Sequence, residues 1–218
     1  MAKKKHNQNE LVTRQYVAEF RASDEEGSVI EGTPIVFGQD TKMQDWCGEY
    51  IERIDPHALD NTDLKDVLLC VNHDIDKIPL ARSKNGKGTM SFNIDSEGLH
   101  IKANLDVENN QEARSVYSAI QREDLSGMSF MFRIDKQEWL DLDTDLPTRV
   151  IKGISIVHEV SVVNFPAYPQ TSINARSNSE ETEYSPLEEA RKAYAEETAT
   201  RSNGLLEIEK LKNANRLK

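Results

Sequence analysis

The strongest constraint on the fold is a carboxylate in the middle of an apolar run late in the chain. Residues 154–163 (Ile-Ser-Ile-Val-His-Glu-Val-Ser-Val-Val) are mostly β-branched, which is typical of a buried strand. Glu159 lies at the centre of this run, and burying its charge costs several kcal/mol unless a partner is present. A histidine ring N–H would serve, since a carboxylate behind an imidazole fixes its tautomer. Arg133 is the other candidate partner.

Side-chain alternation predicts which residues of this strand share a face. One face would carry Ile154, Ile156, His158, Val160 and Val162, and the other Ser155, Val157, Glu159, Ser161 and Val163. A bulge would change this division and would reverse the choice between Glu159 and His158.

The surrounding sequence predicts a β-rich domain, because residues 13–174 alternate short apolar runs with turn-forming residues. Residues 66–71 are apolar on both faces and predict a central, buried strand. Residues 127–139 and 148–163 predict two long strands joined by an acidic loop at 141–145.

Two further local patterns complete this domain. Residues 89–94 and 99–105 flank Asp-Ser-Glu-Gly, which predicts a hairpin. Residues 109–122 carry apolar side chains at spacings of three and four, which predicts one helix.

The two ends of the chain differ from this domain. Residues 1–12 form a basic terminus that we expect to be disordered, so the folded domain is predicted to span 13–176. Residues 177–218 begin with a polar linker and predict two polar helices, at 186–198 and 205–217. This tail is either a solvated, marginal helix or a docking helix that uses a thin apolar stripe of Leu205, Ile208 and Leu211.

Charge and cysteine content limit the partners. A net charge of −11 argues against binding to nucleic acid, whose phosphates would be repelled. No run approaches the roughly 18 apolar residues of a membrane span. Cys47 and Cys70 lack the spacing of a metal or disulfide motif, and we interpret both as reduced thiols.

Three side chains are candidates for chemistry. His73 ends the most apolar strand, where a rigid element can hold a general base. Ser129 follows a glycine turn into a strand, and its hydroxyl would need a neighbouring base to act as a nucleophile. Glu159 is the third. Each also has a structural interpretation: a hydrogen-bonded histidine, a space-filling serine, and a glutamate paired with Arg133.

His57, His73, Asp74 and Asp76 could form a metal site, although their spacing is not that of metal ligands.

Five blocks in order resemble the tailed-bacteriophage prohead protease family, over residues 16–174 in all. They are residues 32–37 (Gly-Thr-Pro-Ile-Val-Phe), 49–59 (Glu-Tyr-Ile-Glu-Arg-Ile-Asp-Pro-His-Ala-Leu), 71–74 (Val-Asn-His-Asp), 126–130 (Ser-Gly-Met-Ser-Phe) and 158–169 (His-Glu-Val-Ser-Val-Val-Asn-Phe-Pro-Ala-Tyr-Pro).

The resemblance implies an α+β fold similar to that of the herpesvirus capsid-maturation proteases. That fold is a small β-barrel surrounded by helices, to which this chain would add a helical or disordered C-terminal tail. The resemblance also implies a serine endopeptidase that needs no cofactor or metal. It would act in the host cytoplasm, inside the assembling prohead.

The expected substrates are the scaffold or the scaffold-like region of the major capsid protein, and the protease itself. Self-association is possible for such an enzyme, whereas nucleic-acid and membrane partners are not expected. A non-enzymatic assembly or scaffolding module is the alternative function. A metal-dependent hydrolase built on His57, His73, Asp74 and Asp76 is a third hypothesis.

The resemblance also assigns roles by position. His73 would be the general base, Ser129 the nucleophile and Glu159 the third member, with His158 as the alternative. Donors for the oxyanion would come from the turn at residues 164–168.

Overall fold

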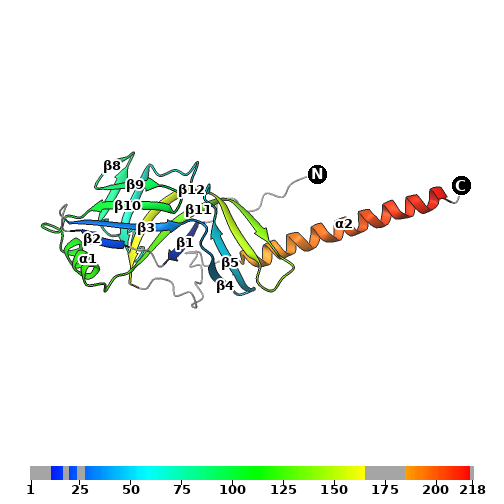
Figure 1. Ribbon diagram of the computed structural model, residues 1–218, viewed down its shortest axis with the longest axis horizontal. Helices are drawn as coiled ribbons and strands as arrows, with labels where there is room; N and C mark the ends of the chain where they lie inside the picture. The colour runs from blue at the N-terminus through cyan, green and yellow to red at the C-terminus, as the bar shows by residue number, and fades with distance from the viewer. Residues whose placement is uncertain (1–10, 17–19, 24–27, 165–184, 217–218) are drawn as a thin grey trace.

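A computed structural model of the chain describes residues 11–16, 20–23, 28–164 and 185–216. Strands and the short helix α1 (Gln111–Gln121) form the body, and the long helix α2 (Pro186–Arg216) leads away from it (Figure 1). The strands are β1 (Leu11–Tyr16), β2 (Phe20–Ser23), β3 (Val29–Val36), β4 (Thr41–Asp45), β5 (Gly48–Ile54), β6 (Asp66–Val71), β7 (Ala81–Lys84), β8 (Lys87–Gly88), β9 (Met90–Ile94), β10 (Gly98–Asn104), β11 (Gly127–Leu140) and β12 (Thr148–Val163).

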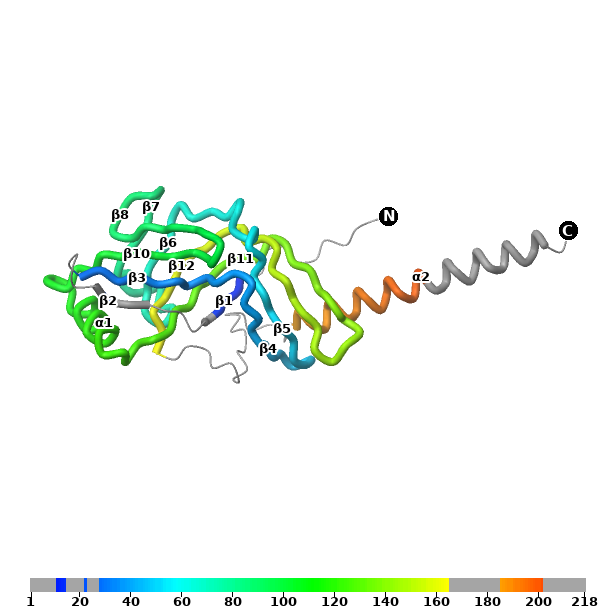
Figure 2. Tube along the Cα trace, viewed as in Figure 1, coloured from blue at the N-terminus to red at the C-terminus, as the bar shows by residue number. Residues whose placement is uncertain are grey.

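Strand β12 is the centre of the larger sheet, whose order is β1-β11-β12-β6-β7-β8. Strand β11 pairs with it in an antiparallel ladder that runs from Gly127 opposite Val163 to Leu140 opposite Thr148. On its other side, β5 pairs in parallel with the beginning of β12 and β6 with the end, and β4 pairs with β5. The chain trace in Figure 2 shows β12 beside β6 and β11. Residues distant in sequence therefore meet along this one strand.

The second sheet has the order β2-β3-β10-β9, and its inner face shares one core with the larger sheet. Ile35, Leu99 and Phe130 come from both sheets and are completely buried in this core. Helix α1 adds its buried face, which carries Ala113, Val116, Tyr117 and Ile120.

Most of the predicted elements are confirmed. The buried strand at 66–71, the hairpin of β9 and β10, the helix α1 and the two long strands all lie within a few residues of their expected positions. Strand β1 begins at Leu11, two residues before the expected start of the domain. The α+β class is confirmed. Among the described residues, however, the strand pairings form two sheets that do not close on each other, so the barrel stays a prediction.

The expected division of β12 into two regular faces is wrong, because the ladder with β11 shifts register at several points. Glu159 is opposite Met131 and Val157 is opposite Phe132, which leaves His158 as an extra residue in a β-bulge. The residues buried in the core are consequently Ile154, Val157, Val160 and Val162, which do not follow strict alternation.

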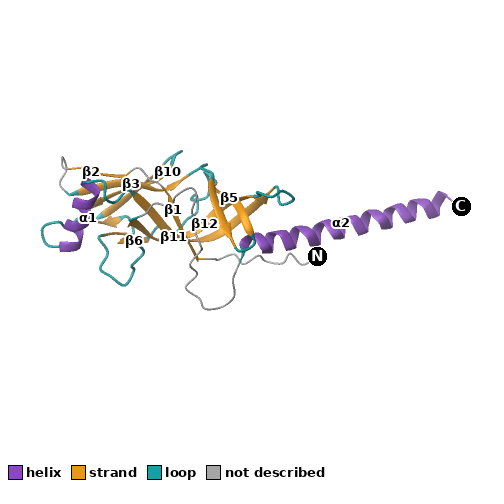
Figure 3. Cartoon of the chain, turned by 90° about the horizontal axis from the view of Figure 1, so that it is seen from below, coloured by secondary structure: helices purple, strands orange, loops and turns teal. Residues whose placement is uncertain are grey.

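The prediction of two helices in the tail is also wrong, since α2 is one helix of 31 residues. Gly204, in the predicted break, costs about 1 kcal/mol inside a helix but does not end one as proline would. The helix begins with a cap at Ser185, whose Oγ accepts a hydrogen bond from the Glu188 N–H at 2.9 Å. Leu187 is fully buried against Met43 and Tyr50, so the start of α2 belongs to the folded body. Figure 3 shows α2 continuing past the strands.

A buried group of three charges joins β1, β5 and β12. Arg14 makes a two-pronged ion pair with Glu52, in which its Nη2 lies 2.8 Å from Oε2, and Arg149 Nη1 lies 3.3 Å from the same oxygen. None of the three residues is more than 2% exposed. Burial raises the pKa of Glu52, but the two guanidinium groups outweigh it and leave that pKa below its ordinary value. The charged form is therefore the one that the fold stabilises.

We predict that Glu52→Gln lowers the free energy of unfolding by about 3–5 kcal/mol, because two buried guanidinium groups lose the charged carboxylate that both of them bind. The stability from a lowered carboxyl pKa is fully present above the unfolded value near 4.5 and is lost as pH falls through the folded value. Urea unfolding at pH 7 and pH 4 should therefore show a smaller difference between wild type and variant at pH 4. Asp40→Asn, which breaks the exposed pair with Arg53, is the matched control and should cost at most about 1 kcal/mol. Equal losses in the two variants would contradict the prediction.

Candidate active site

His73 lies in a strained turn directly after β6. Asn72 and His73 have φ values of 51° and 63°, a left-handed conformation that costs energy in residues other than glycine. The end of β12 holds the turn. The Asn72 N–H donates to the Val162 carbonyl at 3.0 Å, and the Asn164 N–H donates to the Asn72 side-chain oxygen at 3.2 Å. Strain at two successive residues persists only because these contacts determine the backbone.

The structure brings His73 and Glu159 together. Nδ1 of His73 lies 2.5 Å from Oε1 of Glu159, and the two side chains are 16% and 1% exposed. A carboxylate can only accept a hydrogen bond, so Nδ1 carries the ring proton and Nε2 has the free lone pair. Nε2 is buried and makes no hydrogen bond with the described residues. In the neutral ring, this tautomer leaves Nε2 free to accept a proton, as a general base must.

Ser161 connects both members of this pair, a role that was not predicted from the sequence. Its Oγ donates to Glu159 Oε2 at 2.5 Å and accepts a hydrogen bond from the His73 backbone N–H at 3.0 Å. The signal was present in the sequence, because Ser161 follows Glu159 by two residues and side chains two apart share a face of a strand.

Ser129 is placed on the neighbouring strand, directly opposite Ser161 in the β11–β12 ladder. Side chains opposite each other in such a ladder have Cβ atoms about 4.5–5.5 Å apart. The serine is fully buried, and its hydroxyl donates to the Arg14 carbonyl of β1 at 2.7 Å. In this structure the hydroxyl is thus bound to β1, while the His73–Glu159 pair lies one strand away.

His158 has a different environment at the bulge. Burial lowers its pKa below the ordinary 6.5, the charge of Arg133 lowers it further, and Glu159 partly opposes both. Its Nε2 is buried and has no hydrogen-bond partner among the described residues. The geometry therefore pairs Glu159, and not His158, with His73.

Cys70 is a second potential nucleophile beside this group, since it is opposite Ser161 in the β6–β12 ladder. Burial, followed by the negative charges of Glu159 and Asp74, raises its pKa to about 12. The thiolate is the reactive form of cysteine, so Cys70 is inert at neutral pH. It is a free cysteine, as is Cys47.

The hypothetical metal site is not supported by the geometry. In the part of the chain that the structure describes, no group of three or more His, Cys, Asp or Glu residues is arranged to hold a metal ion. His57 lies in an exposed turn, 3.2 Å from Asp60, and Asp74 pairs with Lys77.

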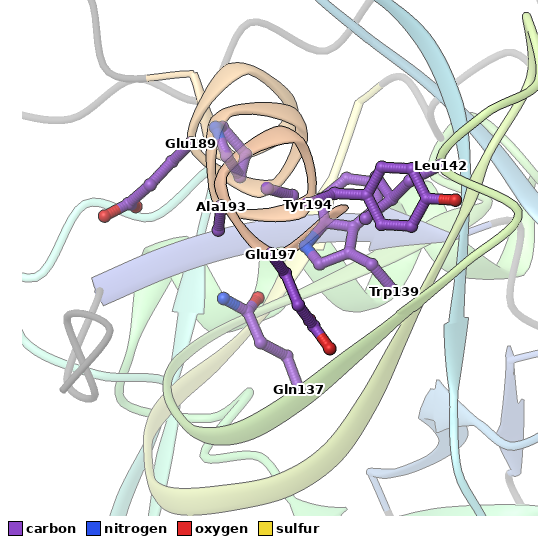
Figure 4. A pocket seen from close by; sticks show the side chains of 9 residues that line it. Gln137, Trp139, Leu142, Glu189, Ala193, Tyr194 and Glu197 are labelled. Carbon is purple, nitrogen blue, oxygen red and sulfur yellow. The ribbon is translucent and has the colours of Figure 1, made fainter. Parts of the chain in front are cut away.

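A cleft of about 280 Å³ lies elsewhere, between the start of α2 and the β11–β12 hairpin. Figure 4 shows side chains of α2, among them Tyr194 and Glu197, facing Gln137 and Trp139 of β11. None of the three predicted catalytic residues lines it. Neither helix in the described ranges is long and apolar enough to cross a membrane.

In a comparison with protein-family models, residues 17–185 matched the caudovirus prohead serine protease family. The chain belongs to this family. Membership implies a serine peptidase with a role in capsid maturation, and it confirms the family that the five sequence blocks indicated. No curated protein and no solved structure matched the chain. Strand β1, which binds the Ser129 hydroxyl, lies before the residues that match the family.

We predict that His158 makes the fold sensitive to mild acid. Its pKa is lowered in the folded state, so below pH 6.5 the unfolded chain takes up a proton that the folded chain does not, and stability falls as pH decreases. His158→Gln removes this proton uptake. Urea unfolding at pH 7.5 and pH 5.5 should show a smaller loss of stability in the variant than in wild type. His57→Gln, at a histidine whose side chain is 82% exposed, is the control and should behave as wild type does. An unchanged loss in His158→Gln would refute the prediction.

Proposed function

We propose that the chain is a serine endopeptidase that cleaves the scaffold, or the scaffold-like region of the major capsid protein, inside the prohead, and that it also cleaves itself. Ser129 is the nucleophile, His73 the general base and Glu159 the residue that orients His73. Family membership supports the class of reaction. The observation that best supports the residues is the 2.5 Å contact of His73 with the buried Glu159, one strand from the Ser129 hydroxyl.

In the first step the Ser129 hydroxyl leaves the Arg14 carbonyl and donates to Nε2 of His73. Rotation about one side-chain bond is enough to change the direction of a serine hydroxyl. Hydrogen bonds between nucleophile and base are often long or poorly aligned in enzymes without substrate. The Ser129 oxygen attacks the scissile carbonyl as Nε2 takes the proton. Glu159 stabilises the imidazolium that forms, because its carboxylate lies against the opposite ring nitrogen.

In the second step the tetrahedral intermediate collapses and the C–N bond breaks. His73 returns the proton to the leaving amine, and an acyl-enzyme remains on Ser129. Water, deprotonated by His73, then hydrolyses the ester and regenerates the hydroxyl. Of the turn at 164–168 expected to hold the oxyanion, only Asn164 is described, and its N–H is bound to Asn72. The other four residues of that turn lie outside the described ranges.

Burial of the proposed nucleophile, Ser129, is consistent with a protease that becomes active only in the presence of concentrated substrate. Ser129 is 0% exposed, and its hydroxyl is bound by a backbone carbonyl. A substrate peptide must therefore reach the site through a local rearrangement. Reaction inside the prohead, where substrate copies are concentrated, would favour that rearrangement by mass action.

We predict that Ser129→Ala abolishes truncation of the capsid protein. Co-expression of the full chain with its cognate capsid protein, followed by intact mass spectrometry, should give a discrete shorter product with wild type and none with the variant. Ser83→Ala is the matched control, because Ser83 is a strand serine only 1% exposed whose hydroxyl has no partner among the described residues. An unchanged product with Ser129→Ala would exclude Ser129 as the nucleophile. Incorporation without any truncation, by wild type as well, would instead favour the non-enzymatic assembly module.

We predict that Glu159→Gln and His158→Gln differ in activity. Exchanging the orienting carboxylate for an amide in serine proteases lowers kcat by about 10⁴-fold through the wrong imidazole tautomer, and Glu159→Gln should lose activity by about 10³–10⁴-fold. His158→Gln should remain within about threefold of wild type, because Nδ1 of His73 is bound to Glu159 and Nε2 of His158 has no hydrogen-bond partner among the described residues. The rates at which the two purified variants cleave the capsid protein decide whether Glu159 or His158 orients His73. Greater loss in His158→Gln would reverse the assignment.

A further inference from the structure

We propose that Ser161 is a positioning residue for catalysis, whose hydroxyl holds both the Glu159 carboxylate and the His73 backbone in the reactive arrangement. This inference rests on the proposed function. It concerns a residue that touches neither the substrate nor the reacting atoms, and that acts through the two residues on either side of the hydroxyl.

The two hydrogen bonds of Ser161 use the hydroxyl as donor and acceptor at once. The O–H donates to Glu159 Oε2 at 2.5 Å, and the oxygen accepts the His73 N–H at 3.0 Å. Glu159 Oε1 is meanwhile bound to His73 Nδ1. Both carboxylate oxygens thus have a partner, and the side chain is only 1% exposed. Without Ser161, Oε2 would be a buried charged atom without a hydrogen bond.

The backbone contact matters because His73 is strained. The left-handed φ of 63° at His73 follows another of 51° at Asn72, and such a pair relaxes unless neighbouring groups hold it. The Asn72 N–H is held by the Val162 carbonyl of β12, whereas the His73 N–H is held by the Ser161 side chain. The Ser161 hydroxyl thereby fixes the His73 backbone, from which the side chain extends. Through Glu159, it also fixes the orientation of the imidazole ring.

Rigid placement makes Ser161 suited to this role. It is 0% exposed and lies between two ladder partners, Ser129 on β11 and Cys70 on β6. A side chain on a strand that is paired on both sides has little freedom. The hydroxyl therefore fixes the orientation of the Glu159 carboxylate. Because Ser129 is the opposite residue, the same position on β12 also sets the separation between nucleophile and base.

The test uses three variants of the full chain that separate the hydroxyl from the shape of the side chain. Ser161→Ala removes the hydroxyl, and Ser161→Thr and Ser161→Val have nearly the same shape but differ in the hydroxyl. Ser83→Ala is the control for a buried strand serine without a partner. The measured quantities are the rate at which a fluorophosphonate reagent labels Ser129, and kcat and KM for capsid-protein cleavage.

We expect Ser161→Ala and Ser161→Val to label Ser129 about 10- to 100-fold more slowly than wild type, which is the effect of losing hydrogen bonds to a charged group. The value of kcat should fall by a similar factor with KM unchanged, because Ser161 does not contact substrate. Ser161→Thr should restore most of the rate, and Ser83→Ala should equal wild type. Equal rates for the Thr and Val variants would overturn the proposal, since shape and not the hydroxyl would then decide.

A second measurement does not depend on activity. In the Ser129→Ala background, proton NMR should show the hydrogen-bonded Nδ1 proton of His73 far downfield, and Ser161→Val should broaden or lose this signal. Retention of the same signal in Ser161→Val would also overturn the proposal. If wild type neither is labelled at Ser129 nor truncates the co-expressed capsid protein but the NMR difference is present, the proposed catalytic function fails, while the hydrogen-bonding role of Ser161 stands.

Discussion

The antiparallel ladder between β11 and β12 is the constraint on which the rest of the structure depends. It carries much of the core on one face and the polar group of Ser129, Glu159 and Ser161 on the other. The parallel strands β5 and β6 are fixed by the opposite edge of β12. Core packing and site geometry are therefore two results of one register, and a slip of the ladder would damage both.

Buried carboxylates of this sheet need partners, and nearby side chains supply them. The described residues of the strands include two buried carboxylates, and each is satisfied in a different way. Glu52 has two guanidinium partners, Arg14 and Arg149. Glu159 has an imidazole and a hydroxyl as its partners. A guanidinium binds a carboxylate permanently, whereas an imidazole can gain and lose a proton, which makes the second environment suited to catalysis.

Much of the fold could be predicted from the sequence, because residues such as Val67, Phe130 and Val160 follow patterns that report burial directly. The need of Glu159 for a partner could also be predicted, since a carboxylate in a valine-rich strand is costly alone. The bulge at His158 could not, because register shifts depend on how two strands fit and leave no local signal. The bond between Ser129 and Arg14 could not either, since it joins residues 115 positions apart through a backbone carbonyl that every residue possesses.

The position of β1 separates two features of the candidate site. The carbonyl that binds the Ser129 hydroxyl belongs to a six-residue strand outside the matched range of the family, yet this strand is fastened to the body through Arg14 and Glu52. Substitutions in so short a segment can change how firmly the resting hydroxyl is held without altering the His73–Glu159 pair. The strand that holds the Ser129 hydroxyl and the pair proposed to activate it can therefore change independently of each other.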